Sequence, residues 1–525
     1  MLGYAADTAR QAFEEASLEF RNVMRQFVAP LPFVHSLILL LCVSILPVTV
    51  LADERPLSVS IDWKDVVRTS NTTISLQVVV NPLLRQGSEI HDPAWASLKR
   101  LHADYVRFVP WYPYPRLGVA ELNPPTAEGT SWDFSLIDPL VSDFFDATSG
   151  HPVMLNFSTI PQWMFRTEAP VTFPADPNEV TWGYEQGQEL RDSSAKEVAE
   201  YYARIAGWYA HGGFVDERGK THASPFHYKI DFWEVLNEPE YEHTLSPQTY
   251  TNIYDAVAES VHEVLPETRF VGMSLAEPSS RPEFFEYFLD PRNHKPGVPL
   301  DYISYHFYAV PTDGQTPAIH QYTFFDQADK FLTAVRYIEA IRRRLSPGTK
   351  TAINEVGCIL PDDNRPEPDA ISDSYWNLCG ATFAYVYVSL VREGIEILSS
   401  SQLVGYPTQF PSVTMTDWKT GRPNARYRVL QLLRENFGPG DQLVNMTLSS
   451  PHVAAEAFIT ADGAHKLLVV NKRAQSIQLV IPGAVGARET HVDLASGGNP
   501  PVSSPVTSNA ITLGPYSVSI LALRH

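Results

Sequence analysis

The chain has 525 residues, of which 44% are hydrophobic and 19% charged, and its formal net charge is −20 at pH 7. This composition is typical of a folded protein with a sizeable core, and the length favours one large domain and a smaller one. The acidic balance excludes nucleic acid and an anionic membrane surface as partners, because neither attracts a negatively charged protein.

The first 52 residues are predicted to be a signal peptide or a signal anchor. Residues 31–52 form an apolar run that ends in Val50-Leu51-Ala52, which fits a cleavage site before Asp53. If translation started at Met24, the segment before the apolar run would have the short length of an ordinary signal-peptide n-region. The run is also long enough to span a membrane if it stays uncleaved, the one case in which a membrane is a partner. Either way, we expect the rest of the chain outside the cytosol, secreted or anchored.

Cysteines and glycosylation sequons bear on the same compartment. Cys42 lies in the N-terminal segment, so Cys358 and Cys379 remain, either as one disulfide or as two buried thiols. Sequons that predict a glycoprotein occur at Asn71, Asn156 and Asn445. Asn156 lies inside an apolar, strand-like run, so we expect it to escape glycosylation.

Strand-like and helical patterns alternate along residues 53–439. A half-buried strand at 57–62 comes first and is assigned to an accessory sheet. Strand-like runs then occupy 74–80, 105–109, 152–157, 230–236, 268–273, 302–307, 350–354 and 395–399. Helical patterns occupy 93–102, 135–147, 195–209, 247–264, 282–289, 325–345, 372–393 and 424–436.

Eight alternations of strand and helix predict an α/β fold, a closed parallel (β/α)8 TIM barrel. The competing fold is an open, doubly wound sheet. That fold normally carries a glycine-rich phosphate loop after an early strand, and the sequence has neither G-x-G-x-x-G nor a Walker motif.

The pattern changes after Gly438-Pro439-Gly440. The remaining chain consists of short alternating runs separated by Gly, Pro, Ser and Asn, which predicts a β-sandwich. The predicted organisation is therefore a targeting segment (1–52), a catalytic barrel with an N-terminal accessory strand (53–439) and a C-terminal β-sandwich (440–525).

Two glutamates stand at the ends of two predicted strands, Glu238 before Pro239 and Glu355 before Val356. Each directly follows an asparagine. In a parallel barrel the carboxyl ends of all strands open onto one face, so the two side chains can meet there. Cleavage of a glycosidic bond requires two carboxyl groups, one to donate a proton and one to attack or to activate water. Either glutamate alone could be a solvent-facing strand end, but two at corresponding places favour catalysis.

The surroundings suggest a role for each carboxyl group. Glu238, beside apolar strand residues and a proline, suits the proton donor, which must stay protonated at the operating pH. Glu355 suits the nucleophile, which needs hydrogen-bond donors that stabilise its anion. Asn237 could hold a substrate hydroxyl next to the reacting carbon.

The segment Trp233-Glu234-Val235-Leu236-Asn237-Glu238-Pro239, with a second glutamate ending the seventh strand, resembles the clan A retaining glycoside hydrolases. Within the clan, residues 55–525 are most similar to family 39, which includes β-xylosidases and α-L-iduronidases. The resemblance implies Glu238 as acid/base, Glu355 as nucleophile and Asn237 as the residue that binds the hydroxyl beside the anomeric carbon. Many members have Trp at Leu236 and Thr at Asn354, so substrate specificity does not carry over.

Three further positions resemble clan residues. His306 and Tyr308 end the sixth strand, where His306 would face the sugar and Tyr308 would orient the nucleophile. Arg107 on the second strand would help to keep Glu355 ionised. An aromatic packing cluster and a core or surface arginine are the alternative interpretations.

Tryptophans follow the second, third and eighth strands and are candidates for stacking on a sugar ring, with core packing as the alternative: Trp111, Trp163 and Trp418. Because no cluster of His, Asp and Cys has metal-ligand spacing, no metal or other cofactor is expected.

The sequence thus predicts a secreted retaining glycosidase that acts by double displacement, an exo-acting, β-xylosidase-like enzyme on an oligosaccharide or glycoside. Two alternatives stay open, a transglycosidase on the same residues and a non-catalytic carbohydrate-binding pseudo-enzyme. The sugar, its anomer and the oligomeric state are not specified by the sequence.

Overall fold

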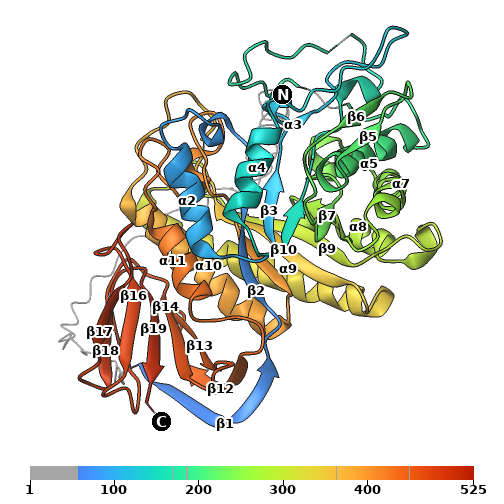
Figure 1. The fold of residues 1–525 in the computed structure, drawn as a ribbon. Helices are drawn as coiled ribbons and strands as arrows, with labels where there is room; N and C mark the ends of the chain where they lie inside the picture. The colour runs from blue at the N-terminus through green and yellow to red at the C-terminus, as the bar shows by residue number, and fades with distance from the viewer. Residues whose placement is uncertain (1–56, 170, 185–186, 362, 449, 525) are drawn as a thin grey trace, which may run out of the picture. The chain divides into compact units, whose positions relative to one another are not determined.

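The computed structural model describes residues 57–524 except 170, 185–186, 362 and 449 (Figure 1). The predicted targeting segment, residues 1–52, lies outside the described residues. Within the described part of the chain, no helix combines the length and apolar character needed to cross a membrane.

Eight parallel strands close into a barrel, in agreement with the predicted α/β fold. Each strand corresponds to one of the predicted runs, and they follow one another around the barrel in chain order. They are β2 (Thr73–Val79), β3 (Val106–Val109), β4 (Val153–Leu155), β7 (Phe232–Glu234), β8 (Arg269–Leu275), β9 (Tyr302–Ala309), β10 (Lys350–Cys358) and β11 (Ile397–Ser400).

Helices alternate with these strands along the chain, as predicted. The main ones are α2 (His91–Leu101), α4 (Asp138–Ala147), α5 (Lys196–Ala210), α7 (Pro247–Val264), α8 (Pro282–Phe288), α9 (Pro317–Leu345), α10 (Asp373–Glu393) and α11 (Ala425–Arg434). Helix α9 starts at Pro317, well before the predicted 325, because proline is favourable in a first helical turn. Short elements fill the connections: α3 (Pro115–Gly118), α6 (Pro239–Glu242) and the hairpin of β5 (Gly213–Val215) and β6 (Thr221–Ala223).

The barrel interior changes from apolar to polar along its axis. Near the strand beginnings an apolar cluster fills it: Met154, Phe232, Val271, Tyr302, Ala352 and Ile397. Two residues further along the same strands, buried polar side chains follow: Asn156, Glu234, Ser304, Asn354 and Ser399. Because side chains alternate between the faces of a strand, both layers point inward, and the polar layer lies toward the carboxyl ends.

Two strands carry a β-bulge beside this polar layer. In β10, Ile353 pairs with Tyr305 while Glu355 pairs with the next residue, His306, so Asn354 is an extra residue. Strand β8 has a corresponding irregularity between Gly272 and Leu275. A bulge breaks the strict alternation of side chains, which allows consecutive residues to face the barrel interior.

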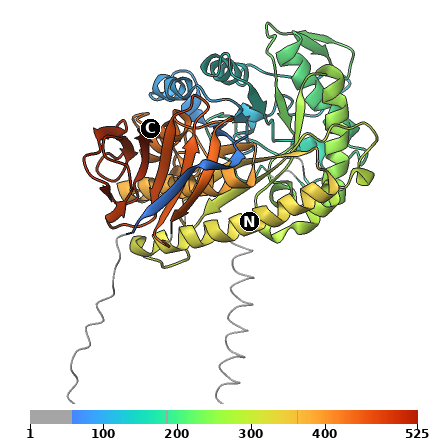
Figure 2. The same ribbon diagram turned by 90° about the horizontal axis from the view of Figure 1, so that it is seen from below.

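The C-terminal part forms an antiparallel seven-stranded sheet packed with a two-stranded one, which confirms the predicted trailing sandwich (Figure 2). The larger sheet has the order β1 (Val59–Thr69), β12 (Gln442–Leu448), β13 (Val453–Ile459), β14 (His465–Asn471), β19 (Val518–Leu523), β16 (Arg488–Val492) and β17 (Val502–Pro505). The smaller one pairs β15 (Ile477–Val480) with β18 (Ala510–Leu513).

Strand β1 belongs to this C-terminal sheet. The sequence predicts the run 57–62 as an accessory strand grouped with residues 53–439, whereas Val59 pairs with Leu448 and Ile61 with Met446. Pairing between residues so distant in the chain leaves no local signal in the sequence. Figure 2 shows the blue β1 among the orange and red strands.

A disulfide joins Cys358, in β10, to Cys379, in α10. Of the two alternatives left open by the sequence, the structure has the disulfide. It attaches the strand that carries Glu355 to the helix that follows it.

Candidate functional site

The structure brings Glu238 and Glu355 together at the carboxyl end of the barrel. Glu238 follows β7, and Glu355 lies within β10. One carboxylate oxygen of each glutamate and one ring nitrogen of His306 lie within 4.8 Å of one another. The side chain of Glu238 is 18% exposed and that of Glu355 9% exposed, so both can be reached from outside.

The backbone around this pair is unusual. Left-handed conformations occur at Leu236 (φ 64°), Glu238 (φ 42°), Met273 (φ 82°) and Ser274 (φ 48°). Each costs a non-glycine residue about 1–3 kcal/mol and persists only where its surroundings impose it. Here the Glu238 amide donates to the Ser274 carbonyl at 3.0 Å, which fixes the two turns against each other.

Strand β9 supplies three consecutive inward-facing side chains to the site. Ser304 donates to Glu234, His306 contacts Glu238, and Tyr308 donates to Glu355. Their spacing of two residues is the period of a β-strand, so one face of β9 serves all three carboxylates.

Glu355 is surrounded by groups that stabilise its anion. Arg107 Nη1 donates to Oε1 at 2.6 Å, and the Tyr308 hydroxyl donates to Oε2 at 2.6 Å. Burial alone would raise the pKa of Glu355, but the charges of His306 and Arg107 and the Tyr308 hydrogen bond outweigh it and lower that pKa. The carboxylate is therefore ionised and suited to act as a nucleophile.

His306 connects the two glutamates. Its Nδ1 lies 2.8 Å from Glu238 Oε1 and its Nε2 lies 3.5 Å from Glu355 Oε1. Burial lowers the pKa of His306, but the negative charges of Glu355 and Glu238 act against it and the net shift is upward. The hydrogen bonds of the ring go to Glu238 through Nδ1 and to the Ser274 hydroxyl, 3.0 Å from Nε2, so Glu355 interacts with the imidazole through charge.

A third carboxylate, Glu234, lies beneath this pair and was not assigned a role from the sequence. It is 1% exposed. Its oxygens accept hydrogen bonds from four side chains: Arg107, Asn156 (2.7 Å), Ser304 (2.6 Å) and Asn354 (2.6 Å). The sequence does contain one indication of this role. Glu234 lies two residues after Phe232 on β7, so its side chain points into the barrel as that of Phe232 does. Glu234 holds the Arg107 guanidinium that in turn binds Glu355.

The amide of Asn237 has a fixed orientation. Its Oδ1 accepts from Arg107 Nη2 at 2.7 Å, and its Nδ2 donates to Glu242 Oε1 at 2.9 Å. One N–H of the amide remains for a substrate hydroxyl.

Glu242, in α6, is a further site residue that no sequence pattern indicates. It also accepts from Trp111 Nε1 at 2.7 Å. Burial, together with the charge of Glu238, raises the pKa of Glu242 well above its ordinary value.

Of the three predicted tryptophans, Trp111 is linked to the site through Glu242, which bonds both Trp111 and Asn237. The Trp111 ring packs against Tyr112 and Trp182 at 5.1 and 5.3 Å. Trp163 instead donates to the Glu121 carbonyl. In the part of the chain that the structure describes, neither Trp163 nor Trp418 has a hydrogen bond or ring contact with Glu238 or Glu355.

The Glu238, His306 and Glu355 atoms are spaced closely enough to surround a metal ion. Their electrostatic setting does not fit one, because Arg107 and His306 already place positive charge on the same carboxylate oxygens. A cation would have to displace these partners, so we assign the cluster no metal.

Comparisons with known proteins bear on this geometry. Residues 212–353 match the family model described as glycosyl hydrolases family 39, a segment that contains β7, Asn237, Glu238, β8, β9 and the beginning of β10 and ends before Glu355. A comparison with curated proteins gave no match. The protein is a glycoside hydrolase. The sequence resemblance to clan A, and to family 39 within it, is confirmed.

Solved structures share the fold of this glycoside hydrolase. A family 51 arabinofuranosidase from Xanthomonas axonopodis pv. citri is 12% identical, with a TM-score of 0.60 and coverage of 89% of this chain and 100% of that chain. An alpha-L-arabinofuranosidase from Thermotoga maritima is 15% identical, with a TM-score of 0.57 and coverage of 89% and 99%. A family 30 endoxylanase from Clostridium papyrosolvens is 15% identical, with a TM-score of 0.53 and coverage of 89% and 100%.

Proposed function

We propose that this glycoside hydrolase is a retaining enzyme that acts by double displacement, with Glu355 as nucleophile and Glu238 as acid/base. The observation that carries the proposal is the close approach of carboxylate oxygens from Glu238 and Glu355, within 4.8 Å. Retaining enzymes hold their carboxyl groups about 5–5.5 Å apart, whereas inverting ones leave about 6.5–9.5 Å for a water molecule. The short separation supports direct attack by Glu355.

In the first step the Glu355 carboxylate attacks the anomeric carbon while Glu238 gives its proton to the glycosidic oxygen. The bond to the leaving alcohol breaks, and a glycosyl ester forms on Glu355. In the second step Glu238 takes a proton from water, whose oxygen attacks the anomeric carbon and releases Glu355.

The neighbouring residues have separate roles in this proposal. Tyr308 and Arg107 keep the nucleophile ionised and oriented, and Asn237 binds the hydroxyl beside the anomeric carbon. His306 positions Glu238 and faces the sugar, and Trp111 forms part of the wall around it.

The proposed substrate is a β-xyloside or a short oligosaccharide cleaved from its end, on the strength of the likeness to family 39. Transfer to a sugar acceptor would use the same two carboxyl groups. A carbohydrate-binding protein without catalytic activity is the weaker alternative, because both glutamates are present and Glu355 accepts hydrogen bonds from Arg107 and Tyr308.

We also propose that the enzyme works outside the cytosol. The disulfide between Cys358 and Cys379 supports an oxidising compartment. Asn71 and Asn445 are exposed and open to glycosylation, whereas Asn156 is buried and bonded to Glu234.

The test is hydrolysis of aryl glycosides by the chain from Asp53 onward, with β-xyloside, β-glucoside, β-galactoside, α-L-arabinoside and α-L-iduronide. We expect one sugar to be cleaved, with product of unchanged anomeric configuration in an NMR time course. First-formed product of inverted configuration would refute the mechanism, and product analysis at high acceptor concentration separates transfer from hydrolysis.

The variants Glu355→Gln and Glu238→Ala assign the roles. We expect Glu355→Gln to lose nearly all turnover with the fold intact. Added azide should rescue Glu238→Ala, because a small anion can take the place of water that needs a base. Near wild-type turnover by Glu355→Gln would show that the nucleophile lies elsewhere.

A further inference from the structure

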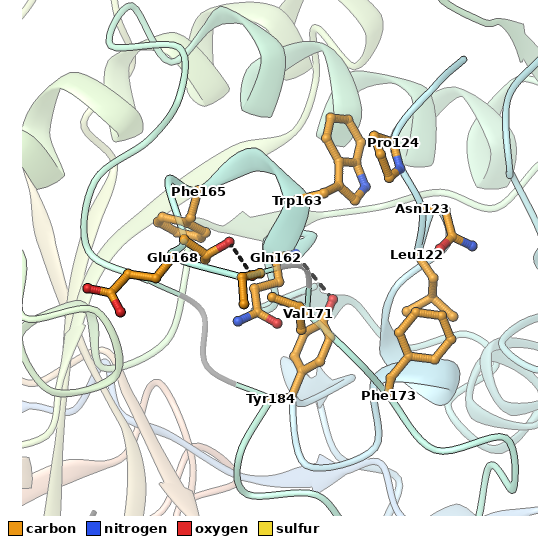
Figure 3. Close-up of a pocket in the computed structure, with 12 residues that line it drawn as sticks. Leu122, Asn123, Pro124, Gln162, Trp163, Phe165, Glu168, Val171, Phe173 and Tyr184 are labelled. Carbon is orange, nitrogen blue, oxygen red and sulfur yellow. Dashed lines mark hydrogen bonds between the residues drawn. The ribbon is translucent and has the colours of Figure 1, made fainter.

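A pocket of about 400 Å³ opens in the loops at the carboxyl end of the barrel (Figure 3). Its lining comes from residues 122–124 before α4 and from the connection after β4, where residues within 162–169, Val171, Phe173 and Tyr184 contribute. Its volume lies within the range of about 300–1,000 Å³ that is typical of small-molecule sites.

The pocket combines an apolar wall with one polar group that has no partner. Phe165, Phe173 and Tyr184 provide rings, and Gln162 is 4% exposed. Figure 3 shows the Gln162 side chain between Phe165 and Tyr184. Its Oε1 is buried and accepts no hydrogen bond from the described residues. Buried amides are normally bonded, so this one is available to a ligand.

The pocket lies on the acid/base side of the site. The Phe165 ring stacks on His243 with ring centroids 5.1 Å apart. His243 directly follows α6, and α6 begins immediately after Glu238. The pocket is therefore built against the short helix that the acid/base residue precedes.

The same loop also packs against Trp111, which is linked to the site through Glu242. Tyr184 lines the pocket, and Trp182, two residues earlier, packs 5.3 Å from Trp111. Trp111 in turn donates to Glu242, the partner of Asn237. The pocket wall thus contacts His243 at one end and, through Trp182 and Trp111, is linked to Glu242 at the other.

We propose that this pocket binds a sugar residue of the leaving-group part of the substrate, beyond the bond that is cleaved. The inference rests on the proposed function, because the acid/base protonates the leaving oxygen and so defines the leaving-group side. Aromatic rings match the C–H faces of a pyranose, and the free Gln162 amide matches its hydroxyls. The natural substrate is then an oligosaccharide and not a simple glycoside.

The kinetic test compares kcat/KM for a hexasaccharide of the cleaved sugar with kcat/KM for its aryl glycoside. In Gln162→Leu we expect this ratio to fall about five- to tenfold, the effect of one neutral hydrogen bond. The thermal midpoint should stay the same or rise, because the lost Oε1 accepts no hydrogen bond from the described residues. Ala169→Phe, which fills the pocket from its exposed rim, should lower the ratio in the same way.

The matched control is Gln478→Leu, an exposed amide on β15 that should leave the ratio unchanged. An unchanged ratio in both pocket variants would overturn the proposal. A second arm titrates the inactive Glu355→Gln protein with xylohexaose and with cellohexaose by calorimetry. The proposal would also be overturned if neither hexasaccharide bound to Glu355→Gln. The same holds if the double variant Glu355→Gln/Gln162→Leu bound them as tightly as Glu355→Gln does. Gln162-dependent binding without any hydrolysis by the wild type would instead refute the proposed function alone.

Discussion

The buried guanidinium of Arg107 organises the site. All five of its N–H groups donate, to Glu234, Glu355, Gln77, Asn237 and Ser274. Burial lowers the pKa of Arg107, but the charges of Glu234 and Glu355 more than compensate and raise it. One fixed positive charge therefore stabilises two buried carboxylates, and each hydrogen bond also fixes the direction of a neighbour.

Tyr308→Phe is expected to shift the pH dependence of catalysis. Burial raises the pKa of Glu355, while the charges of His306 and Arg107 and the Tyr308 hydrogen bond lower it. Loss of a hydrogen bond to the ionised form raises the pKa, so the acid limb of kcat/KM moves to higher pH. A bond to a charged group contributes about 1.5–3 kcal/mol, so kcat should fall about ten- to hundredfold.

Tyr305→Phe is the control for this variant. Tyr305 lies on the same strand but faces the helices, and its buried hydroxyl has no partner among the described residues. Its removal should leave the pH profile unchanged. An identical shift in both variants, or none in Tyr308→Phe, would mean that Tyr308 does not influence the Glu355 ionisation.

At the scale of elements, the register between β9 and β10 determines where the nucleophile points. Gly357 pairs with Tyr308 across the two strands. A Cβ at Gly357 would lie 2.9 Å from Tyr308 Cε1 and 3.3 Å from Arg426 Nη2. The glycine thus lets the tyrosine ring lie flat against β10, where its hydroxyl reaches Glu355.

Gly357→Ala should therefore displace the Tyr308 ring and weaken its bond to Glu355. We expect kcat on an aryl glycoside to fall about tenfold or more, with the far-UV spectrum unchanged, because one charge-assisted bond is lost. Gly348→Ala is a suitable comparison, since a Cβ there meets nothing within 4 Å. Wild-type kcat in Gly357→Ala would show that the ring position is not critical.

The strands and helices could be predicted from the sequence, because each has its own local hydrophobic pattern. The two glutamates could be predicted because they stand at the ends of two such strands. The site residues that escaped prediction depend on features without such a pattern. The bulge at Asn354 turns two consecutive side chains inward, where strict alternation predicts one. Glu242 reaches Asn237 because the backbone turns at Glu238. Trp163 and Trp418 lie in connections whose course periodicity does not specify, and Trp163 lines the pocket proposed for the leaving-group sugar.

At the scale of the whole molecule, the barrel and the C-terminal sheet share one core. Phe458 of β13 packs on Phe437 after α11, with ring centroids 4.4 Å apart, and stacks on Tyr387 of α10. Arg392 of α10 also pairs with Glu456 of β13. Since β1 enters the sheet before the first barrel strand begins, the chain is tied to the sheet at both ends of the barrel.

This shared core predicts that barrel and sheet unfold together. Phe458 is fully buried, and Phe458→Ala should cost about 3–5 kcal/mol, the range for loss of a large core side chain. We expect a single calorimetric transition at a lower temperature, and loss of activity, which reports on the barrel, at that same temperature. Val502→Ala, at an exposed position on the edge strand β17, should leave the midpoint unchanged. Two transitions, of which only one moves while the temperature of inactivation stays constant, would show that the sheet folds independently of the catalytic barrel.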